Sequence, residues 1–348
     1  MAQPVKLTAK VTASPTLHPL TDAAWKKELS NAITSPSVLL NRLGLESYLS
    51  KIDNHSAFKC LVTESFINKI EPGNINDPLL RQILPLNEEN SAIAQQDGIT
   101  DPVGDINAMA SPGLLHKYHG RALLISTGAC AVHCRYCFRR HYPYQQSSCA
   151  SNAVDDAIDY LKRHREIEEI ILSGGDPLVL DNTKLARLIA KLETAPQLKT
   201  LRIHTRLPVV LPNRINQELL KLLTASRFQV VMIIHANHAN ELQHDEFTKL
   251  NQLHNAGIVL LNQSVLLKGI NDNADTLVEL SNRLLECKTL PYYLHLLDPV
   301  AGAMHFSVNE TSALALKKQL EESLPGYLVP KLVREIKGKQ SKTAISSI

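Results

Sequence analysis

The stretch RALLISTGACAVHCRYCFRR, residues 121–140, joins a short apolar run to three cysteines. The run RALLIST, 121–127, is rich in aliphatic and β-branched residues, which predicts a buried strand. Cys130, Cys134 and Cys137 follow at once, separated by three residues and then by two. Clustered thiols directly after a strand predict a ligand site at the edge of a sheet, where loops carry the chemistry.

The chain after residue 120 repeats this kind of strand. Further apolar runs lie at 168–174, 200–206, 228–236, 258–267 and 291–298, with helical patterns at about 152–165, 183–193, 214–225, 241–255, 274–287 and 310–323. After a longer first step the strands recur about every 30 residues, as repeated βα units in a parallel sheet do. Six units are too few for an eight-unit barrel, so we predict an α/β fold, an open partial (βα)6 TIM-like barrel, with its site at the C-terminal strand ends.

The chain before this barrel has a different pattern. Residues 1–86 show apolar positions three and four apart, as in PSVLLNRLGLESYLSKI, which predicts helices. Residues 87–113 are polar and rich in Gly, Pro and Asp, which predicts a long connecting loop. We therefore expect an N-terminal helical region and linker over 1–111, the barrel over 112–326 and a C-terminal segment over 327–348.

Composition excludes several classes of protein. Of the 348 residues, 44% are hydrophobic and 20% are charged, and the net charge is +3 without a lysine- or arginine-rich block. A globular chain that binds no nucleic acid is expected. The N-terminus lacks an apolar signal core, and runs such as VVMII, 230–234, are too short to span a bilayer. With six cysteines, too few for a disulfide scaffold, we expect a cytoplasmic protein that inserts into no membrane.

The three thiols allow two interpretations. His133 or His141 could complete a four-ligand zinc site, although structural zinc usually takes ligands in two separated pairs. A [4Fe–4S] cluster normally has four thiolate ligands, so three leave one iron open for another ligand. The position at the mouth of a barrel favours the cluster.

Cys-x3-Cys-x2-Cys after the first strand of such a chain resembles the radical S-adenosylmethionine superfamily. The resemblance implies that Cys130, Cys134 and Cys137 hold a [4Fe–4S] cluster, whose open iron binds S-adenosylmethionine. The segment SGGDP and the third strand end, RIHTRLPVVLP at 202–212, match places of cofactor contact. The implied contacts are Ser173, Gly174, Gly175, Asp176 and Arg206. From the residues alone, an ordinary strand-to-helix turn and a solvated strand end stay open for these two segments.

From about residue 112 onward the chain resembles the lysine 2,3-aminomutase family more closely. CRYCFRRHYP, LNQSVLLKGINDN, YYLHLLDPVAGAMHF and GYLVPKLVREIKGKQSKTA carry this resemblance. It implies pyridoxal phosphate, bound covalently by a lysine of the C-terminal segment. The family places that lysine seven residues after an acid and before a threonine, which selects Lys342 through Glu335. Lys331, directly after Val-Pro, is the alternative, but it lies in a strand-like run.

The family resemblance also assigns substrate and coenzyme contacts. Arg139 matches the arginine that binds the substrate carboxylate, and a guanidinium can form two parallel hydrogen bonds to it. Asp298 and Glu335 match the acid pair that holds the ε-ammonium of lysine, where the family usually has aspartate in place of Glu335. The contacts implied for the coenzyme phosphate are Lys117, Tyr118 and Arg121. A turn-forming aspartate and a surface lysine are the alternatives for Asp298 and Lys117.

The implied reaction is the radical 1,2-shift that converts L-α-lysine to (R)-β-lysine. The short tail after Lys342, PGLLHKYHGRALL and WKKEL resemble the bacterial branch that supplies β-lysine for modification of elongation factor P. That branch implies free lysine as substrate, a flavodoxin- or ferredoxin-like electron donor, and a downstream ligase. Asn273 stands where relatives with structural zinc have a cysteine, so no zinc is expected, and a homo-oligomer stays open.

Two other functions compete with this one. The first is a catabolic or osmolyte-producing lysine or glutamate 2,3-aminomutase, which uses the same chemistry. The second is a non-enzymatic iron–sulfur or zinc protein, with the three cysteines and His141 as ligands.

Overall fold

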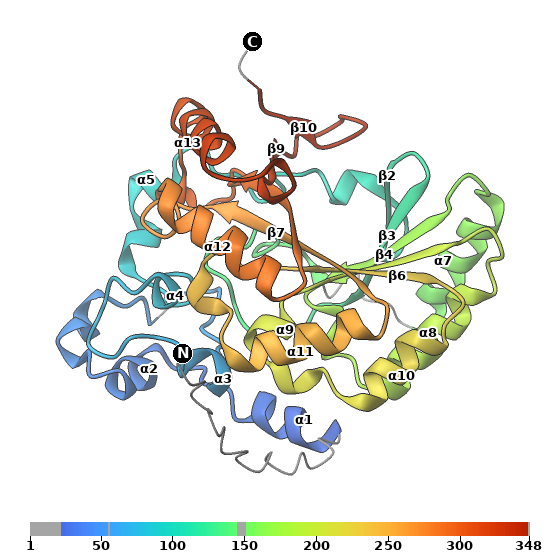
Figure 1. The fold of residues 1–348 in the computed structure, drawn as a ribbon, viewed down its shortest axis with the longest axis horizontal. Coiled ribbons are helices and arrows are strands. Elements are labelled where there is room, and N and C mark those ends of the chain that lie inside the picture. Colours follow the sequence, from blue (N-terminus) through green and yellow to red (C-terminus); the bar gives the residue numbers. More distant parts are fainter. Residues whose placement is uncertain (1–21, 55, 145–150, 347–348) are drawn as a thin grey trace, which may run out of the picture.

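A computed structural model describes residues 22–54, 56–144 and 151–346. Its described residues form one sheet of ten strands in the order of the chain (Figure 1). The strands are β1 Met109–Ser111, β2 Leu114–Tyr118, β3 Arg121–Thr127, β4 Glu169–Gly174, β5 Thr200–Thr205, β6 Gln229–Ile234, β7 Val259–Leu266, β8 Leu290–Leu296, β9 Lys331–Arg334 and β10 Thr343–Ala344. Strands β3 to β9 are parallel, whereas β1, β2 and β10 extend the sheet with antiparallel pairs.

Six helical connections join the parallel strands and run along the outer side of the sheet (Figure 1). The helices are α7 Ser151–Arg163, α8 Asn182–Glu193, α9 Leu207–Val210, α10 Gln217–Ala225, α11 His244–Asn255, α12 Ala274–Glu286 and α13 Glu310–Ser323. Side chains cap several of them, as Asp181 caps α8 and Asn216 caps α10, and such caps satisfy free amides of the first turn. The predicted α/β partial barrel with six βα units is confirmed.

The edges of the sheet differ from the prediction. Strand β9 adds a seventh parallel strand after the sixth unit, and β2 precedes the predicted first strand. Strand β2 begins with two buried leucines and continues with three partly buried polar or aromatic residues, and it pairs with the edge strand β1. A short strand with His116 and Lys117 in it lacks the continuous apolar run that marks the buried strands.

The N-terminal region is helical, as predicted, from residue 22 onward, and the part of that prediction over 1–21 lies outside the described residues. Its elements are α1 Asp22–Ser30, α2 Pro36–Arg42, η1 Glu46–Lys51, α3 Glu64–Ile67 and α4 Pro78–Arg81. They bury Trp25, Leu40 and Phe66 in one hydrophobic core together with strand residues such as Ile203 and Met232. Burying an aromatic or aliphatic side chain of this size contributes about 1.5–3 kcal/mol. These helices therefore brace the barrel rather than form a core of their own.

The segment predicted as a long loop, 87–113, is partly ordered structure. It contains η2 Asn87–Asn90, α5 Ala92–Gln95, η3 Ile106–Ala108 and β1. A bridge pairs Ile99 with Val300, and a Cβ on Gly98 would lie 2.5 Å from the Cα of Ala301. The prediction of a plain loop is wrong because this segment packs against the chain after β8. It brings two acids, Glu89 and Asp105, into the interior.

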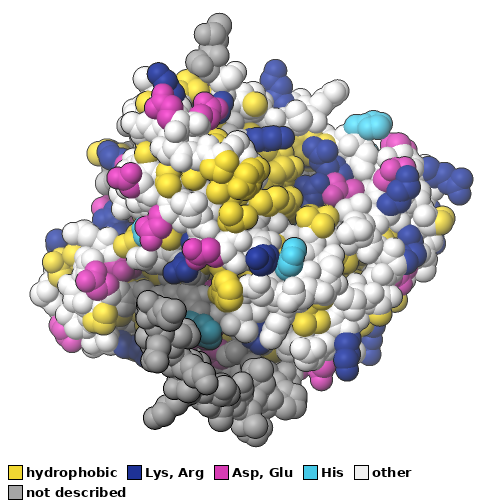
Figure 2. Space-filling view, in the orientation of Figure 1, with side chains coloured by type: hydrophobic (Ala, Val, Ile, Leu, Met, Phe, Trp, Pro, Cys, Tyr) yellow, Lys and Arg dark blue, Asp and Glu magenta, His cyan; other side chains and the backbone are white. Residues whose placement is uncertain are grey.

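Figure 2 shows charged side chains of both signs spread over one face of the molecule, with an apolar patch in its upper half. The described residues include no helix that is long and apolar enough to cross a membrane.

Candidate active site

The cysteine loop follows β3 at the C-terminal end of the parallel strands. Burial, together with Cys137 and Cys134 nearby, raises the pKa of the Cys130 thiol, and burial and Cys134 raise that of Cys137 to about 11. The three thiols are thus close enough to influence one another. Among the described residues, no three His, Cys, Asp or Glu side chains gather tightly enough to share a single metal ion. Thiolates on a [4Fe–4S] cluster bind different irons and need no such single point.

A buried arginine fixes this loop to the N-terminal region. Arg135 is fully buried and forms two ion pairs of 2.6 Å with the carboxylate of Glu89. It also donates to the carbonyl of Phe58 and to the hydroxyl of Ser56. Arg140 binds the same Glu89 carboxylate at 2.7 Å. Each charge is therefore paired, and the loop is held on both sides of Cys137.

Replacing Glu89 by alanine should lower the free energy of unfolding by about 3–5 kcal/mol, because it leaves two buried guanidinium groups without a counter-ion. The neighbouring Glu88 supplies a matched control, since its ion pair with Arg81 is partly exposed. Glu88→Ala should lower the unfolding free energy by less than about 1 kcal/mol. Urea unfolding of both variants measures the difference, and equal losses would contradict the role assigned to Glu89.

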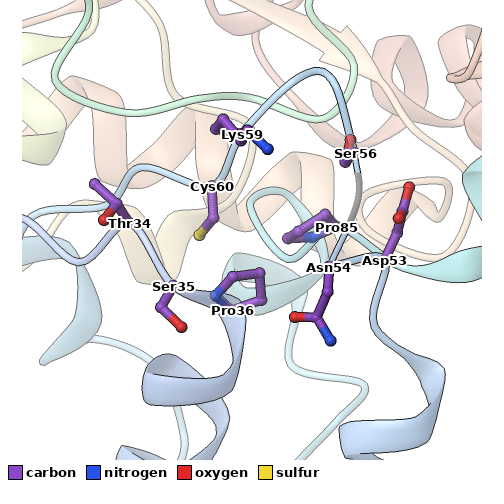
Figure 3. A pocket seen from close by; sticks show the side chains of 9 residues that line it. All are labelled: Thr34, Ser35, Pro36, Asp53, Asn54, Ser56, Lys59, Cys60 and Pro85. Atoms are coloured by element: carbon purple, nitrogen blue, oxygen red, sulfur yellow. The ribbon is translucent and has the colours of Figure 1, made fainter.

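A cavity of about 220 Å³ lies behind the anchoring segment, outside the barrel (Figure 3). Ser35, Asn54, Ser56, Lys59 and Cys60 are among the residues that line it. Two of these lining residues also hold Arg135, Ser56 through its hydroxyl and Lys59 through its carbonyl. The cavity thus lies among the residues that hold the cysteine loop, and not in the barrel interior.

The glycines of SGGDP bring the end of β4 against the cysteine loop. A Cβ on Gly174 would lie 2.4 Å from the carbonyl oxygen of Thr127, and one on Gly175 would lie 2.3 Å from that of Ala129. Gly174 also has a φ of +120°, which other residues rarely adopt. The contact that needs these glycines is therefore with the backbone beside Cys130.

Asp176, the acid of the same segment, is buried with three internal donors. It accepts hydrogen bonds from the hydroxyl of Thr205 and from the amides of Arg206 and Leu178. Burial raises its pKa to about 6 despite these bonds. The contacts join the end of β4 to the end of β5. Asp176 thus accepts hydrogen bonds from the backbone of its neighbours and fixes their positions.

A chain of alternating charges crosses the mouth of the barrel. Arg139 binds Asp105 at 2.7 Å, Asp105 binds Lys117 at 2.6 Å, and Lys117 lies 3.7 Å from Glu335. Glu335 in turn lies 3.1 Å from the amine of Lys342. Burial opposes the charge of Asp105, but Arg139 and Lys117 outweigh it and lower the pKa. Four sequence-predicted residues, Arg139, Lys117, Glu335 and Lys342, are thus brought together.

Strand pairing explains the spacing between the acid and the lysine. Thr343 pairs with Arg334 and Ala344 with Val333 in the antiparallel β9–β10 pair. The next position of the same register places Lys342 opposite Glu335, where the two charges meet. Gly338, with a φ of +82°, lies between the two strands.

Side chains connect the two ends of the open sheet. Tyr118 of β2 donates a hydrogen bond to Glu335, and the guanidinium of Arg121 lies 4.6 Å from the ring centre of Tyr118. Lys117, from the same strand, also donates to the carbonyl of Val103. The structure therefore directs Lys117 and Tyr118 toward Asp105 and Glu335.

Asp298 is the second acid near Lys342. Burial raises its pKa to about 7, Lys342 opposes this, and Glu335 adds to it. No hydrogen bond joins its carboxylate to another described residue. Asp298 therefore lies within electrostatic reach of Lys342 and Glu335, with its acceptor oxygens available.

Three histidines that the sequence analysis did not select line the barrel interior. His204 of β5, His235 after β6 and His295 of β8 all have a lowered pKa, chiefly through burial, and Lys342 lowers each further. They are therefore neutral. The Nε2 atoms of His204 and His295 have no hydrogen-bond partner among the described residues. A polar residue at the end of each apolar strand was the available signal.

Comparisons with known proteins agree with this geometry. The profile of the Radical SAM superfamily matches residues 124–280. An L-lysine 2,3-aminomutase of Haemophilus influenzae is 47% identical over 322 residues, which are 92% of this chain and 94% of that protein. The protein of that name from Escherichia coli is 44% identical, with the same two coverages. The chain belongs to the lysine 2,3-aminomutase family.

This aminomutase-family chain is therefore an enzyme, of the isomerase class. It also matches the L-lysine 2,3-aminomutase of Clostridium subterminale, with 32% identity over 92% of this chain and 77% of that protein. Among solved structures, a radical SAM methyltransferase from Sphaerobacter thermophilus aligns with a TM-score of 0.47 and 16% identity, covering 64% of this chain and 68% of that one.

The alternative residues of this family member have other partners. His133 contacts the carbonyl of Lys59 through Nδ1, and His141 contacts that of Ala301 through Nε2. Lys331 is exposed at the start of β9. Asn273 caps α12 by accepting from the amide of Thr276. None of these contacts places a side chain in the charge chain at the barrel mouth.

Proposed function

We propose that this enzyme converts L-α-lysine to (R)-β-lysine with a [4Fe–4S] cluster, S-adenosylmethionine and pyridoxal phosphate. The observation that carries the proposal is the charge chain from Arg139 to Lys342. It joins the predicted carboxylate contact, the predicted ammonium contact and the predicted coenzyme lysine within one site. The names of the relatives support lysine as substrate.

The residues of the chain suit a [4Fe–4S] cluster, S-adenosylmethionine and pyridoxal phosphate. Three neighbouring thiols at a strand end, one of them in contact with Arg206, suit a cluster. The amine of Lys342, with the unpartnered Nε2 atoms of His204 and His295, suits a planar polar coenzyme. When bound, the cluster and S-adenosylmethionine supply the radical, and pyridoxal phosphate carries the migrating amino group.

The chain itself binds and orients lysine. We infer that Arg139 binds the carboxylate through the guanidinium hydrogens that remain, since its Nε donates to Asp105 and its Nη1 donates to the hydroxyl of Ser173. Asp298 and Glu335 take the ε-ammonium, because two neighbouring, partly buried carboxylates are stabilised by a cation. Tyr118 and Lys117 hold Glu335, and their contacts favour this role over the predicted phosphate contact. Arg121 stays the proposed phosphate contact, with Ser173, Gly174, Gly175, Asp176 and Arg206 proposed around S-adenosylmethionine.

Asp298 makes lysine binding depend on pH. Its pKa of about 7 means that it is neutral below and charged above that value. The kcat/KM for lysine should therefore rise up to tenfold per pH unit below about 7 and level off above it. In Asp298→Asn the kcat/KM for lysine should lack this rise with pH. It should lie at least about thirtyfold below the wild-type plateau, because a buried charged partner of the substrate is lost. The pH profiles of both proteins measure it.

Other titrating groups affect both profiles alike, so the difference between them isolates Asp298. A wild-type profile parallel to that of Asp298→Asn would contradict the assignment of this acid.

The proposal is tested with anaerobically purified, cluster-loaded protein, lysine, S-adenosylmethionine, pyridoxal phosphate and dithionite. Chiral chromatography should detect (R)-β-lysine. Formation of deoxyadenosine without β-lysine would mean that the protein is a radical enzyme but that lysine is not its substrate. Glutamate in place of lysine tests the alternative aminomutase, which the acid pair disfavours because a second carboxylate would face Asp298 and Glu335.

We propose further that the product modifies elongation factor P through a separate ligase. Support comes from the motif resemblance to the short bacterial branch and from relatives of matching length, covered to 94%. Incubating that ligase and elongation factor P with α-lysine and the aminomutase, supplied with its cofactors and dithionite, should add one lysyl mass to the factor. Leaving out the aminomutase should lower this addition, a comparison that is needed because α- and β-lysine have the same mass. No added mass, with β-lysine present, would favour a catabolic or osmolyte role.

The remaining expectations are proposals of the same kind. We place the enzyme in the cytoplasm, where free thiols persist, with a flavodoxin- or ferredoxin-like donor to reduce the cluster. The division at 111/112 and 326/327 likewise stays a proposal.

A further inference from the structure

Arg206 occupies an unusual place beside the cysteine loop. It begins α9 at the end of β5, and its side chain is 4% exposed. One guanidinium nitrogen donates to the sulfur of Cys134 at 2.7 Å. The other donates to Gln82 and to Glu241, at 2.7 and 2.8 Å. The guanidinium thus connects a predicted cluster ligand to a buried carboxylate.

The surroundings leave Arg206 little freedom. Its guanidinium carbon lies 5.5 Å from the ring centre of Phe66 and 5.7 Å from that of Tyr136. Its backbone amide donates to Asp176 at 2.6 Å, which fixes the start of the side chain. Its Nε has no hydrogen-bond partner among the described residues. A cation held this firmly in a buried site acts on nearby charge more strongly than one in water.

Glu241 is the acid that balances this cation. It is fully buried and accepts from the amides of Asn237 and His238 as well as from Gln82. Its pKa is lowered, because Arg206 and these donors outweigh burial. The pair is therefore oriented, with its positive end toward Cys134 and its negative end away.

We propose that Arg206 sets the reduction potential of the iron–sulfur cluster through its hydrogen bond to the sulfur of Cys134, and that Glu241 limits this effect. One-electron reduction adds one negative charge to the cluster and moves no proton. Hydrogen bonds to cluster sulfurs and nearby charges are known determinants of such potentials. An oriented cation stabilises the reduced state more than the oxidised state. The inference rests on the cluster of the proposed function but not on its substrate or coenzyme.

The two residues give shifts of opposite sign. In Glu241→Gln the charge of Arg206 is uncompensated, so the cluster should become easier to reduce. In the double variant Arg206→Met, Glu241→Gln both charges and the sulfur contact are gone, so the cluster should become harder to reduce. Removing both charges together leaves no unpaired buried ion, which protects the fold. A general loosening of the site would not reverse sign between the variants.

The test is a redox titration of the reconstituted full chain, followed by the electron paramagnetic resonance signal of the reduced cluster, without lysine or coenzyme. At the wild-type midpoint, the ratio of reduced to oxidised cluster should fall roughly tenfold in the double variant, which is about 59 mV for one electron. It should rise in Glu241→Gln. Arg202 and Glu169, an ion pair on β5 and β4, supply the matched control, Arg202→Met, Glu169→Gln, with a ratio within about twofold of wild type.

Shifts of the same sign in the two variants, or shifts no larger than that of the control, would overturn the inference. If the double variant takes up no cluster, Arg206→Lys replaces it. That variant keeps the positive charge but loses the guanidinium that bridges Cys134 and Glu241. Its ratio of reduced to oxidised cluster must therefore fall below that of wild type. If the wild-type protein forms β-lysine and the variants have the same cluster reduction potential as wild type, this inference is rejected and the proposed function stands.

Discussion

Replacing Lys342 by alanine is expected to lower β-lysine formation by about a thousandfold or more. In the proposed function this lysine holds pyridoxal phosphate in register with the radical source and the substrate contacts, and losing such positioning removes several orders of magnitude in rate. The side chain is partly exposed, and its ion pair with Glu335 is near the surface of the barrel mouth. The variant should therefore fold normally. Product analysis and thermal unfolding measure the two effects separately.

Lys331→Ala is the matched control for this prediction, because Lys331 also follows the Val-Pro pair but is exposed at the start of β9. It should keep wild-type activity. Borohydride reduction followed by peptide mapping should find pyridoxal phosphate on Lys342 in both wild type and Lys331→Ala. Coenzyme trapped on Lys331 would reverse the assignment.

Replacing Cys134 by alanine is expected to remove the cluster and with it all cleavage of S-adenosylmethionine. Three thiolates are the fewest that hold a site-differentiated [4Fe–4S] cluster, so two leave it unstable. Iron content and deoxyadenosine formation should both fall to background. The loss of one partly buried thiol should leave the fold intact, since Arg135 and Glu89 hold the loop from the other side.

Cys287→Ala serves as its control. Cys287 is buried at the end of α12, and burial raises the pKa of its thiol to about 11. It should keep wild-type iron content and activity, with a small loss of stability from the cavity. Equal iron loss in both variants would mean that the cluster ligands lie elsewhere.

The barrel could be predicted from the sequence because buried parallel strands are nearly continuous apolar runs. Ile170 to Leu172 and Met232 to Ile234 are such runs, and each proved to be a strand. Strand β2 was missed because His116 and Lys117 interrupt its apolar pattern. Helices such as α8 and α12 followed from apolar positions at helical spacing, and the structure adds the Asp181 and Asn273 caps at their first turns.

The site was predictable where a local motif carries it. The three cysteines and the register from Glu335 to Lys342 are of this kind, and the β9–β10 pairing explains the second. The partners in the 87–113 segment were not predictable. Asp105 lies among Gly and Pro residues, where an acid usually forms a turn. Its buried contact with Arg139 joins positions 34 residues apart, and no pattern along the chain shows such a pair.

The joining of the two sheet ends by side chains has a consequence for the order in which the enzyme matures. Cys137 leaves the ribosome about 200 residues before Lys342, which at roughly 5–20 residues per second is about 10–40 s. The anchors of the cysteine loop, Ser56 and Glu89, have emerged even earlier. Tyr118, by contrast, can form its hydrogen bond to Glu335 only after that residue has been synthesised. The loop that carries the three cysteines can therefore take shape during synthesis, whereas the proposed coenzyme site forms only after Lys342 has emerged.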